Sequence, residues 1–153
     1  MKSYRLREVK MKIFKDENIQ LNQHYENKVE AILAAGEILV ENGYVAESYL
    51  QDMLAREEEV STYIGNNIAI PHGIVKSVEK IYSSGISLLQ VPEGVDFDGN
   101  TAYLVFGIAG KNNEHLEILG QIATICSEME NVEILRQATS KAKILKIFEE
   151  VVV

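Results

Sequence analysis

The stretch that predicts the fold is residues 84–109, with the sequence SGISLLQVPEGVDFDGNTAYLVFGIA. It contains two largely apolar runs, at residues 84–91 and 102–109. Residues favoured in turns lie between the runs, as PEG at 92–94 and DGN at 98–100. The second run has few polar alternations, which is typical of a strand covered on both faces. The stretch therefore predicts two strands inside a buried sheet, each bounded by a turn.

Helical periodicity lies on both sides of these strands. A helix is predicted from Glu26 to a stop at Asn42-Gly43, where glycine tolerates the left-handed conformation that ends a helix. A second helix is predicted over 46–57, and short strands over 19–21 and 67–71. The apolar positions on which the helices depend are Val29, Ile32, Leu33, Ile38 and Leu39; Tyr49, Leu50, Met53 and Leu54; Leu116, Leu119, Ile122, Ala123 and Cys126; and Ile144, Leu145, Ile147 and Phe148.

The order of elements, helices then strands then helices, predicts an α/β sandwich with a mixed β-sheet flanked by helices. A length of 153 residues suits a single domain. We expect this domain over 16–153. Residues 1–15 are basic but lack the apolar segment and cleavage site of a secretory signal, so we expect a mobile or loosely docked extension.

Charge and composition exclude several classes of partner. Lys and Arg number 15 against 23 Asp and Glu, a net charge of −8. Neutralising phosphate backbones requires the opposite balance, which argues against nucleic acid. The longest apolar stretch, residues 102–110, is about half of the roughly 20 residues that span a bilayer, so no membrane insertion is expected. The single cysteine, Cys126, cannot form an internal disulfide and reads as a core residue, which fits a cytoplasmic protein.

The chain has only three histidines, and two of them follow predicted strands. His72 lies in IAIPHG (68–73), where proline stiffens the approach and glycine lets another molecule come close. His115 lies in GKNNEH (110–115), in the first turn of the helix expected there. Strand ends are where α/β sheets place their sites. From spacing alone, either the two histidines converge in one cleft or they are unrelated surface imidazoles. His24 is expected in an exposed loop.

Four segments of the chain resemble one protein family. The sequence is similar to the enzyme IIA component of the phosphoenolpyruvate-dependent sugar phosphotransferase system, in its mannitol/fructose class. The resemblance spans about residues 18–150 and is closest to the mannitol-specific branch in PEGV (92–95) and FGIAGKNNEH (106–115). The segments are MLARE (53–57), TYIG (62–65), IAIPHG (68–73) and NNEH (112–115).

This resemblance implies a phosphoryl carrier, a phosphotransferase component that works through a phosphohistidine. His72 would accept a phosphoryl group from the histidine-containing phosphocarrier protein and pass it to a cysteine of the IIB component. The membrane IIC component would couple transfer to uptake of a sugar alcohol, mannitol in the matching branch. His115 and Arg56 match the supporting histidine and arginine of the family. The resemblance implies no cofactor and no metal.

Several alternatives stay open in the sequence. The local sequence favours an ion pair of Arg56 with the acidic residues 57–59, and Thr62 either hydrogen-bonds near the site or caps a turn. The same fold also serves in regulatory proteins, where phosphorylation biases a partner. A metal-dependent hydrolase built on His72 and His115 is a further reading, although no recognised metal-binding pattern supports it.

Overall fold

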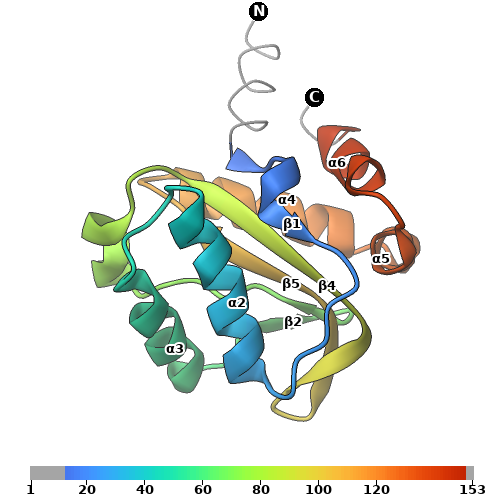
Figure 1. The fold of residues 1–153 in the computed structure, drawn as a ribbon, viewed down its shortest axis with the longest axis horizontal. Helices are drawn as coiled ribbons and strands as arrows, with labels where there is room; N and C mark the ends of the chain where they lie inside the picture. Colours follow the sequence, from blue (N-terminus) through green and yellow to red (C-terminus); the bar gives the residue numbers. More distant parts are fainter. Residues whose placement is uncertain (1–12, 151–153) are drawn as a thin grey trace, which may run out of the picture.

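A five-stranded mixed β-sheet lies between two layers of helices in the computed structural model, which describes residues 13–150 (Figure 1). The sheet order is β1-β4-β5-β3-β2. The pairs β1–β4 and β3–β5 are parallel, whereas β4–β5 and β2–β3 are antiparallel. The predicted α/β sandwich with a mixed sheet is therefore confirmed. The strands are β1 (Ile19–Gln20), β2 (Tyr63–Gly65), β3 (Ile68–Ala69), β4 (Gly85–Phe97) and β5 (Asn100–Ala109).

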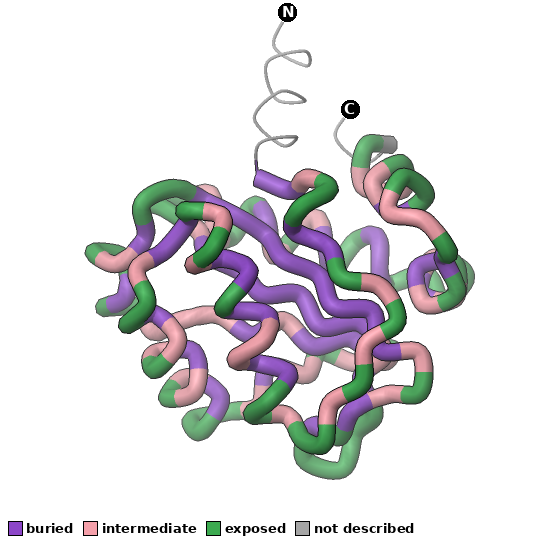
Figure 2. Tube along the Cα trace, in the orientation of Figure 1, coloured by how far each residue is buried: buried purple, intermediate pink, exposed green. Residues whose placement is uncertain are grey.

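The two faces of the sheet bury separate apolar clusters. Along β5, Leu104 and Phe106 face one cluster and Val105 faces the other, as the alternation of side chains across a strand requires. Figure 2 shows the central strands buried along most of their length. Helices α2 (Lys28–Glu41) and α3 (Tyr49–Glu59) cover one face, and α4 (Glu114–Cys126), α5 (Met129–Gln137) and α6 (Lys141–Glu150) contribute to the other. Short 3-10 helices lie at η1 (Asp16–Asn18) and η2 (Val75–Lys80).

One of the two predicted turns is wrong. The DGN turn joins β4 to β5, with positive φ at Asp98 (54°) and Gly99 (93°). The PEG segment instead lies within β4, where the pairing register shifts between Gln90 and Val95. Gly94 adopts φ 87° in this irregularity. Proline and glycine are tolerated inside a strand at a bulge, and sequence signals alone do not separate a bulge from a turn.

Small residues decide how the helices pack, and they explain several misassigned positions. The buried face of α2 includes Ala31, Ala35 and Gly36, whereas Val29 is 45% exposed. A Cβ on Gly36 would lie 2.2 Å from a methyl of Leu50, so α2 and α3 pack closely there.

The second predicted helix begins at Tyr49 and not at residue 46, and the strand β2 and the helices η2 and α5 were not predicted.

The buried stripe of α4 also differs from the prediction. It consists of Ile118, Ile122, Ile125 and Cys126, while Leu116 and Ala123 are exposed. Cys126 is a core residue as expected, and burial raises the pKa of its thiol to about 12.

The core begins earlier in the chain than the expected domain boundary at residue 16. Ile13 and Phe14 are buried, and the ring of Phe14 packs edge-on against Phe148 at 5.1 Å between centroids. The rest of the expected extension, residues 1–12, lies outside the described residues. Within 13–150, no helix combines the length and the apolar character needed to cross a bilayer.

Gln90 connects β4 to segments on two sides, which gives a first prediction. Its side-chain amide donates to the carbonyls of Leu135 (2.9 Å) and Ala138 (2.8 Å), and its oxygen accepts from the Asn22 N–H (2.9 Å). Gln90→Leu leaves these groups without their partner, so the free energy of unfolding should fall by about 1–3 kcal/mol. Urea denaturation measures the change. The exposed Gln20→Leu control should stay within about 0.5 kcal/mol of wild type, and equal effects would contradict the assignment.

Candidate functional site

The ends of β3 and β5 lie side by side because these strands are parallel. Their pairing begins at Ile68 and resumes beyond β3 as an isolated parallel bridge between His72 and Ile108. The Ile108 N–H also donates to the Pro71 carbonyl oxygen at 2.9 Å. These contacts hold His72 beside the last residues of β5.

His115 reaches the same place from the end of β5. The strand ends at Ala109 and α4 begins at Glu114, so His115 lies in the first helical turn, as expected. A Cβ on Gly110 would lie 2.3 Å from the Cα of His115, so this tight connection requires glycine. The His72 and His115 ring centroids are 5.0 Å apart with the rings tilted by 56°. The two histidines converge, which the sequence had left undecided.

The protonation of the His72 ring follows from its hydrogen bond. Nδ1 lies 2.8 Å from the carbonyl oxygen of Ile70. A carbonyl oxygen only accepts, so Nδ1 carries the ring proton. In the neutral ring Nε2 then has a free lone pair, which is what an attacking nitrogen needs.

The surroundings of both imidazoles favour the neutral form. Partial burial lowers the pKa of His72, and the positive charge of Arg56 adds to this, against opposing effects of the Ile70 hydrogen bond and the Glu57 carboxylate. Burial also lowers the pKa of His115, with a smaller effect from His72. These shifts favour uncharged rings near neutral pH, and the Ile70 contact leaves the lone pair of His72 on Nε2.

Arg56 lies near this pair but does not form the ion pair that its neighbours in sequence suggested. Its Nη1 donates to the Val60 carbonyl oxygen at 2.7 Å. Among the ion pairs of the described residues, none joins the guanidinium to a carboxylate. Arg56 thus keeps a positive charge close enough to His72 to lower the pKa of that ring.

The Glu57 carboxylate binds Thr62 and Lys28 and is not paired with Arg56. Glu57 is 4% exposed, and its carboxylate accepts from the Thr62 N–H (3.0 Å) and from the Thr62 hydroxyl (2.6 Å). Lys28 lies 3.3 Å from the other oxygen and also binds Asp98 at 2.8 Å. Thr62 therefore hydrogen-bonds to Glu57 and does not cap a turn alone. The hydrogen bonds of Glu57 fix the end of α3, which carries Arg56, against the start of β2.

Residues that the sequence analysis missed support the segment around His72. Tyr49 had been assigned only to the core. Its hydroxyl donates to the Ile108 carbonyl oxygen (2.8 Å) and accepts from the Gly73 N–H (2.9 Å). Ser77 accepts from the Ile74 N–H (2.9 Å) and donates to Asp52 (2.7 Å), which also binds Lys80. The sequence offered one indication of this role of Tyr49, since a buried tyrosine usually needs a hydrogen-bond partner.

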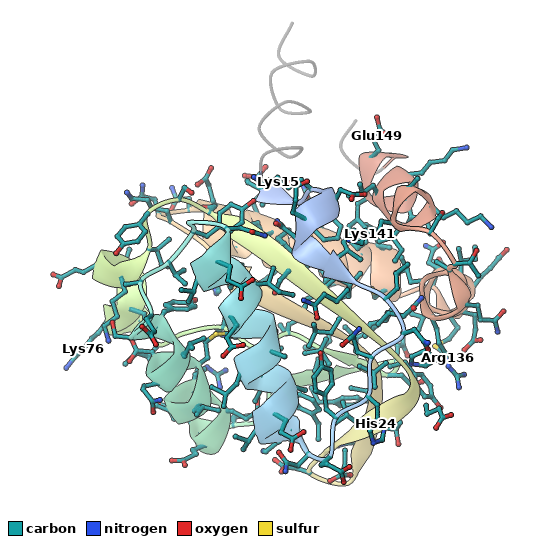
Figure 3. All side chains as sticks on the ribbon, viewed as in Figure 1. Lys15, His24, Lys76, Arg136, Lys141 and Glu149 are labelled. Carbon is teal, nitrogen blue, oxygen red and sulfur yellow. The ribbon has the colours of Figure 1, made fainter. Side chains whose placement is uncertain are left out.

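His24 lies apart from the site. It is exposed and sits 3.6 Å from the Glu26 carboxylate, as a loop histidine was expected to be. Figure 3 shows it at the end of the molecule with the β4–β5 turn, whereas His72 lies at the opposite end of β5. In the part of the chain that the structure describes, no cluster of three or more His, Cys, Asp or Glu side chains could hold a metal ion.

An α/β sandwich with two adjoining imidazoles at the ends of parallel strands defines the class of site, and sequence comparison identifies the family. The profile of the family described as phosphoenolpyruvate-dependent sugar phosphotransferase system, EIIA 2, matches residues 12–151. The mannitol-specific phosphotransferase enzyme IIA component of Geobacillus stearothermophilus is 56% identical over 142 residues, 92% of this chain and 98% of that protein. The component of the same name from Bacillus subtilis is 54% identical, covering 92% and 99%. The chain belongs to this EIIA family.

Solved structures agree with this assignment. The complex of enzyme IIA mannitol and phosphorylated enzyme IIB mannitol from Escherichia coli contains a chain that superposes with a TM-score of 0.84 at 38% identity, covering 90% of this chain and 99% of that one. The crystal structure of IIA mannitol from Escherichia coli gives 0.81 at 39% identity, covering 86% and 96%.

The lowered imidazole pKa values predict how stability depends on pH. Below the ordinary value of 6.5, the unfolded chain binds more protons at these positions than the folded chain does. Stability should therefore fall as pH decreases below 6.5, by at most about 1.4 kcal/mol per pH unit for each ring. Urea denaturation between pH 5 and 8 measures the slope. His115→Gln should flatten it, so identical slopes in wild type and His115→Gln would contradict the prediction.

Proposed function

We propose that this protein is a phosphoryl carrier that accepts a phosphoryl group on His72 and passes it to a cysteine of a IIB component. The observation that carries the proposal is the pair of neutral imidazoles 5.0 Å apart, in which the Ile70 carbonyl leaves His72 Nε2 free. Family membership supports the reaction class, since the family takes its name from the sugar phosphotransferase system.

In the first step, Nε2 of His72 attacks the phosphorus of a phosphohistidine on the histidine-containing phosphocarrier protein. A new N–P bond forms on His72, the donor N–P bond breaks, and its electron pair returns to the donor ring. The His72 ring becomes a phosphoimidazolium that still carries its proton on Nδ1. The Ile70 carbonyl, 2.8 Å from Nδ1, stabilises the positive charge that develops there.

Phosphoryl transfer depends on positioning and on stabilising charge, and the neighbours of His72 suit both needs. The Arg56 guanidinium is a suitable partner for phosphoryl oxygens, because its donors match their geometry. His115, whose ring centroid lies 5.0 Å from that of His72, would orient the His72 ring or donate a hydrogen bond to the phosphoryl group. Both roles act on the group during transfer and require no metal or cofactor.

In the second step, a cysteine thiolate of IIB attacks the phosphorus, an S–P bond forms, and the electron pair of the broken N–P bond returns to Nε2. Exposed apolar side chains follow the two histidines closely in the chain, Val75 at 95% exposure and Leu116 at 73%. Such residues suit a small, short-lived interface with each partner in turn. The net charge of −8 would steer a basic carrier toward the protein.

We assign mannitol as the transported sugar alcohol on the names of the relatives that are 54–56% identical. The structure in which an enzyme IIA mannitol binds phosphorylated enzyme IIB mannitol supports a IIB component as acceptor. Both reactions would take place in the cytoplasm, where the soluble partners of such a relay and the inner face of a permease are found.

His72→Ala should abolish phosphate acceptance while leaving the fold intact, because no other nucleophile replaces Nε2. The protein is incubated with phosphoenolpyruvate, enzyme I and the histidine phosphocarrier, and its intact mass is recorded. Wild type should gain one acid-labile, base-stable phosphoryl group, and so should the His24→Ala control. Acceptance by folded His72→Ala would end this assignment, as would no uptake by wild type beside an active enzyme IIA.

His115→Ala should retain some acceptance but transfer more slowly to a mannitol IIB component, by about tenfold or more if one charge-stabilising contact is lost. Rapid-quench measurement of phosphoryl loss from His72 to IIB gives the rate. Transfer at the wild-type rate would remove the supporting role of His115. If wild type accepts phosphate but never phosphorylates IIB, the result would favour the alternative of a regulatory protein whose phosphorylation state controls a partner.

A further inference from the structure

We infer that Tyr49 is a positioning residue for phosphoryl transfer, acting through its hydroxyl on the peptide that follows His72. The inference rests on the proposed function and adds to it a residue that never touches the phosphoryl group. Tyr49 is the first residue of α3 and is 2% exposed, so its hydroxyl has no access to a substrate. Any effect on the reaction must pass through the backbone groups that it binds.

The hydroxyl bridges the two strand ends that form the site. It donates to the Ile108 carbonyl oxygen at 2.8 Å and accepts from the Gly73 N–H at 2.9 Å. Ile108 is the residue that pairs with His72 across the sheet, and Gly73 is the residue directly after His72. One oxygen atom thus ties the peptide beyond His72 to the end of β5.

The ring of Tyr49 adds a steric constraint to this link. A Cβ on Gly73 would lie 2.6 Å from Cε1 and 2.9 Å from Cζ of Tyr49. The tyrosine ring therefore packs on the backbone of Gly73, in the space that any side chain would need. This contact explains the glycine of the IAIPHG segment through packing, since its φ is not positive.

The hydroxyl keeps its proton across the working pH range, which the bond to Ile108 requires. Burial raises the pKa of Tyr49 to about 12, with the nearby Asp52 carboxylate adding to the effect and the Gly73 hydrogen bond opposing it. Phenylalanine would fill the same volume without either bond. It would leave a buried carbonyl and a buried N–H without this partner.

His72 is consequently held from both sides. The Ile70 carbonyl, two residues before His72, fixes Nδ1, and Tyr49 fixes the peptide on the following side. With the hydroxyl removed, the peptide after His72 can move and Nε2 loses its fixed direction. A displacement of about 1 Å at a reacting atom costs on the order of 100-fold in rate.

The test compares Tyr49→Phe with Tyr44→Phe. Tyr44 is also buried in the apolar cluster on the sheet face that α2 and α3 cover. Its hydroxyl accepts from Asn18 at 3.0 Å and not from the segment around His72. Tyr49→Phe should lower the rate constant for phosphoryl acceptance about 10- to 100-fold with little change in KM for the phosphocarrier. Tyr44→Phe should lose stability without this loss of rate. Equal rates in wild type and Tyr49→Phe, or equal losses in both variants, would overturn the inference.

Two measurements on the unphosphorylated protein separate this inference from the proposed function. Nitrogen-15 NMR of His72 should show a single Nδ1–H tautomer in wild type and Tyr44→Phe. In Tyr49→Phe the freed peptide lets the ring move off the Ile70 carbonyl, so a tautomer mixture is expected. A single tautomer in all three would contradict the inference even if the relay is active. The second measurement is hydrogen exchange of the Gly73 amide in wild type, which requires no variant. Slow exchange is expected, and rapid exchange would overturn the inference.

Discussion

The parallel pairing of β3 with β5 is the constraint on which the rest of the site depends. Because both strands end at the same edge of the sheet, the residues after them meet, and His72 and His115 come within 5.0 Å between ring centroids. If β3 ran antiparallel to β5, the ten residues of β5 would place the two histidines roughly 30 Å apart. β3 itself is two residues long, so its alignment relies on β5 and on β2.

The charges around His72 are arranged so that the positive one remains available. Arg56 and Glu57 are neighbours in sequence, but consecutive residues of a helix do not face each other, so each side chain finds other partners. Thr62 and Lys28 occupy the Glu57 carboxylate, and the Val60 carbonyl orients Arg56. The guanidinium charge therefore acts on the His72 ring, where it favours the neutral form and, in the proposed relay, would suit an incoming phosphoryl group.

Local patterns predicted those parts of the fold and site that depend on local sequence. The buried strand at 102–109, the DGN turn, and the positions of His72 and His115 after strands all follow from a few neighbouring residues. The bulge at Gly94 did not, because it is defined by its pairing with β5. Tyr49 was also missed as a supporting residue, since its partners lie 24 and 59 residues away in the chain.

The rigidity of the His72 segment has a reason in the proposed relay. A carrier must present the same nitrogen to a donor and then to a different acceptor, so closure around one partner cannot provide the alignment for both. Alignment must be built into the free protein. The Ile70 carbonyl, the Tyr49 hydroxyl and the close packing of Gly110 on His115 each fix one element of the site without contacting a partner. The partners then need only a small apolar contact, which lets each one leave after transfer.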